Sequence, residues 1–391
     1  MTEPAPGAAA MVAYARYPED PRVRREAEAL ARHGWDVHVV ALQGDVEAPR
    51  EEVSGVHVVR VPFQAVRGGR LRYAYQYAVF LLLAAAGLRR LRREAGLRIV
   101  HVHSLPDFLA LVAVPWKLRG VRVVLDLHEA MPELVAARFR LPMGAPLVRI
   151  AAALERLSCG VADDVVTVNE HVRGLLEARG VPRGKVTVLY NSPSWSAPSP
   201  RPVDGLVYAG GLNRERDLLT YLRALAAVPG PALTATFYGR GDDSYLEELR
   251  ALAAQVRISD RVRFPGYLPP ERVLGELAAS AVGVVTYERN PLTEVAVPNK
   301  VFEYALVRRP LVLPDLRALR ALFDGAALFY EPGDAGDLAA KIAEVLRGGP
   351  DVDVRVVRAA AIAADLSWER MEARLLVLYA KAPSRSGAGR R

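Results

Sequence analysis

The sequence predicts an α/β protein made of two doubly wound domains in tandem. Its 391 residues exceed one ordinary domain and suit two. Hydrophobic residues make up 51% and charged residues 25%, which is the profile of a soluble globular protein. Short Val-rich apolar runs alternate with amphipathic Ala/Leu/Arg segments. That alternation predicts parallel sheets that are covered by helices on both faces.

The expected elements fall into two groups on either side of a Pro- and Ser-rich stretch, 192–205. Before it we expect strands at residues 10–15, 36–42, 56–61, 99–104, 122–128, 164–169 and 185–191, with helices such as 20–33, 71–95 and 144–159 between them. After it we expect strands at 206–210, 233–239, 261–267, 281–287, 311–314 and 327–330. The predicted organisation is a domain at 1–192, a linker at 193–205, a domain at 206–366, a C-terminal helix at 367–382 and a disordered tail at 383–391.

Charge and cysteine content narrow the class of protein. The net charge of +8 favours an anionic partner. The single cysteine, Cys159, cannot form an intramolecular disulfide, and its Ala/Leu-rich context is typical of a buried structural thiol. No signal peptide is recognisable, and the longest apolar run, 78–88, is too short to span a bilayer, so we expect a cytoplasmic protein. The segment 71–93 fits a core-covering helix with a basic end, or a helix on an anionic membrane surface at the inner face.

The stretch 295–310, V-A-V-P-N-K-V-F-E-Y-A-L-V-R-R-P, predicts a helix that begins near Pro298 and ends before Pro310. Unpaired backbone N–H groups and the dipole make a helix N-terminus an anion site, and Lys300 adds a cation in the first turn. Phosphate is therefore the expected ligand. An ordinary surface helix with a Lys300–Glu303 pair fits the same pattern.

Glycine-rich turns follow two strands of the second domain. In Y-A-G-G-L-N-R-E-R-D, Gly210 and Gly211 allow close approach of a ligand to the backbone, and Arg214 and Arg216 could grip a diphosphate. Further expected contacts are Gly239 in F-Y-G-R-G-D and Tyr267, whose ring could pack on a base. Each turn also fits an ordinary strand end. Neither G-x-G-x-x-G nor a P-loop occurs, so the sequence supports neither a nicotinamide nor a kinase site.

In the first domain, histidines and carboxylates cluster at predicted strand ends. Asp126 and His128 share one face of a strand that Glu129 follows, and His101 and His103 share a face of the preceding strand. Their convergence favours a functional site. Zinc is disfavoured because H-E-x-x-H and a second cysteine are lacking. Arg22, near the start of the first helix, fits an anion contact or an exposed charge.

Taken together, these segments resemble the family-four retaining glycosyltransferases of the GT-B fold, whose two Rossmann-like domains face each other across a cleft. The matching pieces are D-P-R-V-R-R-E-A, A-R-H-G-W-D-V-H-V-V, H-V-H-S-L-P-D, D-L-H-E-A-M-P-E, Y-A-G-G-L-N-R-E-R-D, F-Y-G-R-G-D and V-P-N-K-V-F-E-Y-A, in family order. The closing S-W-E-R helix is similar to the family's C-terminal helix, which returns to the first domain.

The resemblance implies metal-independent transfer of a sugar, with retention, from a UDP-, GDP- or dTDP-linked donor to a glycan, lipid-linked or small-molecule acceptor. It implies no cofactor and no nucleic-acid partner. The first domain would bind the acceptor and the second the donor. Glu303 matches the glutamate that holds the ribose, and Arg216 and Lys300 match phosphate contacts. His128 matches the histidine near the sugar in the first domain, and His128 and Glu129 are the catalytic candidates. The implied site also includes the donor-side residues Gly210, Gly211, Arg214, Gly239, Tyr267, Glu294, Pro298, Asn299 and Val301, and the acceptor-side residues Arg22, His103 and Asp126.

Three departures from the family pattern are visible. Val295 stands eight residues before Glu303, where the family has a sugar-binding glutamate, and Glu294 lies one residue earlier. Gly211 replaces a basic residue, and Y-P-E-D-P-R-V replaces a glycine loop in the first domain. Two alternative functions therefore stay open at this point: a GT-B sugar-nucleotide epimerase, and a non-catalytic protein that binds a nucleotide sugar.

Overall fold

The structure is a computed structural model that describes residues 7–44, 47–63, 70–194, 203, 205–229 and 233–382. Two compact units make up the chain. Unit 1 comprises Met1–Tyr190 and Met371–Arg391, and unit 2 comprises Asn191–Arg370. Most of the expected linker at 193–205 and all of the expected tail at 383–391 lie outside the described residues.

Unit 1 is built on an eight-stranded sheet in the order β3-β4-β2-β1-β5-β6-β7-β8. Its strands are β1 (Ala8–Arg16), β2 (Asp36–Leu42), β3 (Arg50–Val53), β4 (Val56–Val61), β5 (Leu97–His103), β6 (Arg122–Leu127), β7 (Asp164–Thr167) and β8 (Val186–Val188). This order places β1 and β5 at the centre of the sheet. Because β5 pairs with β6 in parallel, the carboxyl ends of these two strands are neighbours, and His103 pairs in register with Asp126.

One strand of unit 1 was missed by the sequence prediction. β3 runs antiparallel to β4, and residues 54 and 55 between them have φ values of +54° and +77°, as a tight hairpin turn requires. Its sequence, R-E-E-V, is polar and mostly exposed, as suits an edge strand, and it carries no apolar signal of a buried strand.

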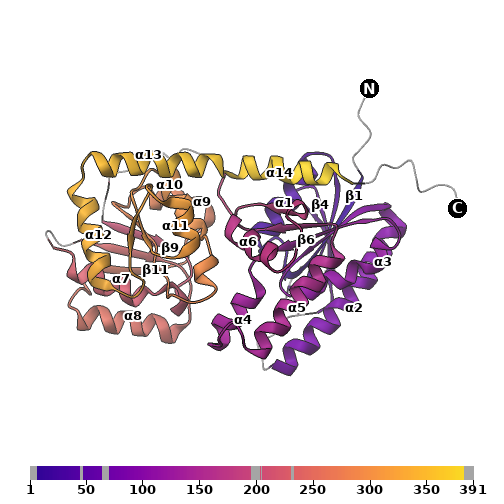
Figure 1. Cartoon of the computed structure of the whole chain (residues 1–391), viewed down its shortest axis with the longest axis horizontal. Helices are drawn as coiled ribbons and strands as arrows, with labels where there is room; N and C mark the ends of the chain where they lie inside the picture. Colours follow the sequence, from indigo (N-terminus) through magenta and orange to yellow (C-terminus); the bar gives the residue numbers. More distant parts are fainter. Residues whose placement is uncertain are drawn as a thin grey trace. The chain divides into compact units, whose positions relative to one another are not determined.

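Helices cover the sheet of unit 1 (Figure 1). Asp20 caps the first of them by accepting hydrogen bonds from the N–H groups of Arg22 and Val23 at 2.9 and 3.1 Å, and a proline follows at the first helical position. The helical elements of unit 1 are α1 (Pro21–Arg32), which Asp20 caps, α2 (Arg70–Ala95), η1 (Asp107–Ala113), α3 (Val114–Lys117), α4 (Met131–Phe139), α5 (Pro146–Val161), α6 (Glu170–Ala178) and η2 (Arg183–Lys185), where η denotes a 3₁₀ turn.

The long helix α2 covers the core, which is one of the two interpretations that its sequence allowed. Phe80, Ala84 and Leu88 are almost fully buried along one face. Among the described residues, no helix combines the length and the apolar content needed to cross a membrane.

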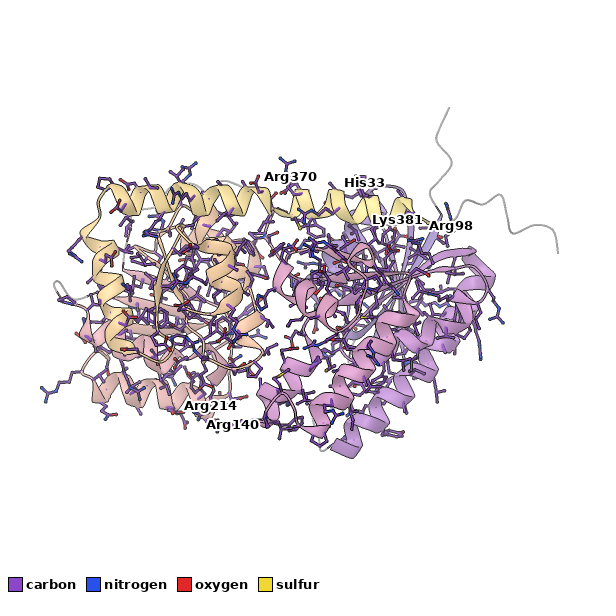
Figure 2. The ribbon with its side chains drawn as sticks, in the orientation of Figure 1. His33, Arg98, Arg140, Arg214, Arg370 and Lys381 are labelled. Atoms are coloured by element: carbon purple, nitrogen blue, oxygen red, sulfur yellow. The ribbon has the colours of Figure 1, made fainter. Side chains whose placement is uncertain are left out.

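The chain returns to unit 1 within α14 (Trp368–Ala380). Met371, Leu375 and Tyr379 are buried there. Polar contacts follow the same segment, since Lys381 Nζ lies 3.2 Å from Asp164 Oδ1 and Arg98 donates a hydrogen bond to the Ala382 carbonyl at 3.3 Å (Figure 2).

Unit 2 contains two three-stranded parallel sheets, β11-β10-β9 and β12-β13-β14. The ladder is interrupted between β9 and β12 because side chains take the backbone groups of Val207: its N–H donates to Ser280 Oγ at 2.9 Å and its carbonyl accepts from the Tyr304 hydroxyl at 2.5 Å. The strands are β9 (Leu206–Ala209), β10 (Ala235–Tyr238), β11 (Val262–Gly266), β12 (Gly283–Val284), β13 (Leu311–Pro314) and β14 (Leu328–Tyr330).

The helices of unit 2 lie on both sides of its strands, with α8 and α13 on opposite sides in Figure 1. This is the doubly wound arrangement that the sequence predicts. The helical elements are η3 (Arg214–Arg216), α7 (Leu218–Ala227), α8 (Asp243–Gln255), α9 (Pro270–Leu277), η4 (Thr293–Val295), α10 (Asn299–Leu306), α11 (Arg317–Phe323), α12 (Ala335–Arg347) and α13 (Pro350–Asp365).

Candidate functional site

Two glycine turns in unit 2 pack backbone against backbone beside Lys300. Gly210, directly after β9, has φ +156°, and a Cβ atom there would lie 2.1 Å from Lys300 Nζ. Gly239, directly after β10, has φ +154°, and a Cβ atom there would lie 1.8 Å from the Gly210 carbonyl oxygen. Only glycine fits either position. The turns therefore leave room for the lysine and hold it against bare backbone.

Lys300 lies in the first turn of α10, which Pro298 and Asn299 begin. Its side chain is only 8% exposed, and Nζ lies 4.7 Å from the centre of the Tyr208 ring. The Tyr208 hydroxyl donates to the Gly211 carbonyl at 2.9 Å, which fixes the ring under the ammonium group. No carboxylate forms an ion pair with Lys300 among the residues that the structure describes.

Arg216 is a second cation without an anionic partner in the described part of unit 2. Its guanidinium carbon lies 4.7 Å from the centre of the Tyr287 ring, and its buried Nε has no hydrogen-bond partner. Its carbonyl accepts a hydrogen bond from Thr286 Oγ1 at 2.5 Å, which fixes η3 against the end of β12. A buried N–H group without a hydrogen-bond partner, on a positively charged side chain, is expected at a site that binds an anion.

The electrostatics of Lys300 agree with this geometry. Burial and, to a smaller extent, the positive charge of Arg216 lower the pKa of Lys300 to about 7, while Glu303 partly opposes the shift. An anion bound beside both cations would favour the charged lysine again. In the free site, the two positive charges therefore repel each other and Lys300 is poorly solvated. A bound phosphate group would reduce both unfavourable effects.

Unit 1 gathers a second cluster at the ends of β5 and β6. Asp126 Oδ2 lies 3.3 Å from His103 Nδ1 and 3.5 Å from His128 Nε2, and the two histidine nitrogens lie 3.2 Å apart. His103 is buried, whereas the His128 side chain is 18% exposed. With Glu129, His103 and His128 line a cavity of about 290 Å³ that is closed on other sides by residues such as Tyr14, Asp20 and Tyr77.

Arg22 corrects the sequence interpretation, because it is neither an exposed charge nor a free anion contact. It is 5% exposed, and Nε and Nη2 donate to the two oxygens of Asp126 at 2.6 and 2.8 Å. Nη1 donates to the Leu189 carbonyl at 3.0 Å. A bound anion would have to displace this bidentate pair, so the geometry gives Arg22 the role of neutralising Asp126.

The charge states of the cluster follow from burial and from Arg22. Burial alone raises the pKa of Asp126, but Arg22, with His128 and His103, lowers it well below its usual range. Burial raises the pKa of Glu26 well above its usual range, and Asp126 adds to the shift. Burial also lowers the pKa values of His101 and His103. The cluster thus favours a negative charge on Asp126, whereas burial disfavours the charged forms of Glu26, His101 and His103.

Both units of the chain match family models of glycosyltransferases. Residues 20–192 match the family model described as a glycosyl transferase 4-like domain, and residues 204–348 match the model described as glycosyl transferases group 1.

The protein is a glycosyltransferase of the GT-B fold.

Solved structures agree on the fold of this glycosyltransferase. Sucrose-phosphate synthase from Thermosynechococcus elongatus is 18% identical with a TM-score of 0.77, covering 96% of this chain and 98% of that one. A glycosyltransferase from Rickettsia africae ESF-5 is 14% identical with a TM-score of 0.72, over 96% and 98%. Anabaena Alr3699/HepE in complex with UDP is 12% identical with a TM-score of 0.72, over 96% and 99%. A search of curated proteins finds no significant match.

The structure divides the predicted donor-side residues of this glycosyltransferase into two groups. Arg214 stands apart, since it is exposed and pairs with Glu248 at 2.6 Å. Glu294 is also engaged: its oxygens lie 3.2 Å from Arg289 Nη1 and 3.0 Å from the N–H of Arg317, the first residue of α11. The group that surrounds the Lys300 ammonium or adjoins it in α10 comprises Gly210, Gly211, Arg216, Gly239, Pro298, Asn299, Val301 and Glu303.

Tyr267 lies beside the second glycine turn. Its ring is 54% exposed and stacks on the Arg240 guanidinium at 4.4 Å, while the Gly239 N–H donates to the Gly266 carbonyl at 2.8 Å. An exposed ring next to backbone without side chains could hold a planar base.

Sequence reasoning missed three residues that build these clusters. Tyr208 and Tyr287 support the two cations, but a tyrosine at a strand end carries no such signal by itself. Glu26 was missed as well, although its position four residues after Arg22, on the apolar face of α1, marks it as a buried partner.

Glu26, His101, His103 and Asp126 could also offer ligand atoms to a cation, since one atom from each lies within 4.8 Å of the others. However, the Arg22 guanidinium already lies 2.6 Å from Asp126 and 3.3 Å from Glu26. A cation would meet this positive charge at short range, so the donor set fits the internal ion pair better than a metal.

Proposed function

We propose that the protein transfers a sugar from a nucleotide-sugar donor to an acceptor hydroxyl, with retention of anomeric configuration and without a metal ion. The observation that carries this proposal is the pair of cations Lys300 and Arg216, which have no anionic partner among the described residues and lie beside the glycine turns of unit 2. Structures of Anabaena Alr3699/HepE with UDP and with UDP-glucose support a nucleotide-sugar donor.

The proposed roles follow from charge and position. Lys300 and Arg216 hold the diphosphate and stabilise the negative charge that grows on it as the glycosidic bond breaks. In a metal-dependent enzyme, a metal ion would stabilise this charge. The backbone of Gly210 and Gly239 lies against the phosphates, and Glu303 accepts hydrogen bonds from the ribose. Unit 2 is thus the donor unit, with UDP, GDP or dTDP as the nucleotide.

In unit 1, His128 and Glu129 are the catalytic candidates, because both line the cavity and His128 is anchored to Asp126. The acceptor, whether a glycan, a lipid-linked sugar or a small molecule, binds this unit. Contact of unit 1 with an anionic membrane is part of the proposal.

Retention and metal independence can be tested without knowing the acceptor. Slow hydrolysis of an α-linked donor should release the α-anomer of the sugar first, as seen by proton NMR before mutarotation. Excess EDTA should leave the rate unchanged. Initial release of the β-anomer would contradict retention, and loss of activity that Mg²⁺ or Mn²⁺ restores would contradict metal independence.

The pKa of Lys300 predicts a proton uptake when the donor binds. Lys300 is largely neutral above its pKa of about 7 and becomes charged beside a bound diphosphate. Calorimetry of UDP, GDP or dTDP in buffers of different ionisation enthalpy should show uptake close to one proton near pH 8.5 and almost none near pH 6, where the lysine is already charged. The Lys300→Met variant should show neither a heat of binding nor proton uptake at either pH.

His128→Ala should lower transfer by about 10²- to 10⁴-fold, the usual contribution of a positioned acid–base group, and leave donor affinity unchanged. His33→Ala is the matched control, since His33 is 47% exposed and does not line the cavity. Normal turnover by His128→Ala would remove this residue from the proposed mechanism.

A further inference from the structure

Helix α5 of unit 1 exposes a row of large apolar side chains. Leu147, Ile150, Leu154 and Leu157 are 41%, 57%, 37% and 52% exposed. Their spacing of three and four residues places them on one face of the helix. The other face packs inward, where Val148, Ala151, Ser158 and Cys159 are buried. Single exposed leucines are common on protein surfaces, but a continuous row of them forms an apolar patch that indicates an interaction site.

The patch continues into α4, which packs against α5. Phe139 at the end of α4 is 39% exposed and Met143 in the following turn is 42% exposed. We call these six residues, together with Arg138, Arg140, Arg149 and Arg156, the α4–α5 face.

The charges on the α4–α5 face are all positive. Arg138, Arg140, Arg149 and Arg156 are exposed, and none forms an ion pair with a described residue. Arg140 is labelled at this end of unit 1 in Figure 2. Some exposed arginines elsewhere do pair with a neighbouring carboxylate, for example Arg272 with Glu276 at 3.1 Å.

The two acidic residues between 131 and 161 do not offset these arginines at the surface. Glu155 is 1% exposed and Glu133 is 4% exposed, and both pair with Arg179. A water-facing helix normally interleaves both signs of charge, whereas this face combines exposed leucines with unpaired cations only.

We propose that the α4–α5 face docks on an anionic lipid bilayer. An amphipathic helix with leucines on one side and arginines at its flanks lies in the plane of the interface: the apolar side chains enter the acyl boundary and the guanidinium groups reach the phosphates. A second copy of the chain fits less well, because a symmetric contact would bring like charges together. This inference rests on the membrane contact of the proposed function and names its surface.

The sequence pointed instead to α2 as the membrane candidate. The structure favours α5, because Phe80 and Leu88 of α2 are buried in the core, whereas the four apolar residues of the α5 row are exposed. Both helices pack against η1, and Figure 1 shows them on one side of the sheet of unit 1.

Vesicle co-sedimentation of the full chain tests this assignment. The protein should bind phosphatidylcholine vesicles that contain about one third phosphatidylglycerol and bind much less to phosphatidylcholine alone. Ile150→Glu/Leu154→Glu should lower binding to the anionic vesicles by more than tenfold. Arg149→Gln/Arg156→Gln should lower it by roughly 25-fold, about fivefold for each cation, and should weaken its salt dependence.

The matched control makes the same substitution on another helix. Val354 and Val357 of α13 are 47% and 60% exposed, but Asp351 and Asp353 stand beside them. Val354→Glu/Val357→Glu should leave vesicle binding unchanged. Equal losses in both double variants would overturn the assignment, as would equal binding to neutral and anionic vesicles.

Two further measurements separate membrane docking from self-association and from the donor site. Analytical ultracentrifugation without vesicles should give the same mass for the wild type and for Ile150→Glu/Leu154→Glu; a change in mass would assign the face to a second copy and overturn the proposal. Lys300→Met should bind vesicles like the wild type, so failure of the donor site and failure of the α4–α5 face are separately visible.

Discussion

Replacing Lys300 by Met should abolish measurable donor binding, with a loss of about 10²- to 10³-fold in transfer, the range seen when one preorganised donor to a developing anion is removed. Arg216→Gln should have a similar effect, because its unpartnered Nε is the second cationic contact. Calorimetry with nucleoside diphosphates measures affinity, and release of free nucleotide measures turnover.

The same substitution should make the free protein more stable. Lys300 is buried with a lowered pKa, so Met removes a desolvated charge and keeps the apolar stem over Tyr208. A gain on the order of 2 kcal/mol in the free energy of unfolding is expected at pH 7. Lys341→Met is the control, since Lys341 is partly exposed and pairs loosely with Glu344 at 3.8 Å. A Lys300→Met protein that is unfolded, or that binds donor normally, would contradict the role assigned to this residue.

Replacing Asp126 by Ala should destabilise unit 1 by about 3 to 5 kcal/mol, because it leaves the Arg22 guanidinium buried without a counterion. Both oxygens of Asp126 accept from Arg22, and the same carboxylate faces His103 and His128. Urea unfolding of the wild type and the variant measures the difference.

Asp163→Ala is the matched control for Asp126→Ala. Asp163 pairs with Lys117 at 2.8 Å and accepts a hydrogen bond from the Val123 N–H at 2.8 Å, but its side chain is about one third exposed, so its loss should cost only about 1 to 2 kcal/mol. A second variant, Arg22→Met/Asp126→Leu, should recover most of the stability lost by Asp126→Ala, because it removes both buried charges. Similar losses of stability for Asp126→Ala and Asp163→Ala would contradict the expected cost of leaving Arg22 buried without a counterion.

The sequence predicts the fold well where burial dictates the pattern. The strand at 36–42 coincides with β2, and the strand at 311–314 coincides with β13, because Val-rich runs between turns have few alternatives. The polar edge strand β3 escapes such reasoning, since its pairing depends on a hairpin turn rather than on apolar residues. The end of β12 was also placed too late: only Gly283 and Val284 pair in its ladder.

The candidate site was predictable as a set of residue types, but not as a set of contacts. Lys300 and Gly210 were both named from local motifs, yet their contact joins positions 90 residues apart in sequence, the difference between 300 and 210. Arg22 illustrates the opposite outcome. Its position near the start of a helix suggested an accessible charge. Only the packing of α1 beside β6 reveals that the Arg22 guanidinium donates to both oxygens of Asp126.

The departure at Val295 has a physical consequence in the structure. Val295 is 6% exposed, so it belongs to the packed interior rather than to a ligand surface. The adjacent Glu294 holds Arg289 and the first N–H of α11, and its carboxylate would have to leave both to reach a sugar. We therefore expect Glu294→Gln to affect the stability of the 289–317 region more than the affinity for nucleoside diphosphates.

The central claim is that unit 2 holds a nucleotide sugar through Lys300 and Arg216. A thermal-shift comparison of the wild type with Lys300→Met/Arg216→Gln, against UDP-, GDP- and dTDP-sugars, tests it most directly. At a ligand concentration about 100 times the dissociation constant, binding adds about 2.7 kcal/mol to the free energy of unfolding, a shift of several degrees. We predict such a shift for the wild type with at least one of these donors and none for the double variant. No shift with any donor, or equal shifts in both proteins, would contradict the claim.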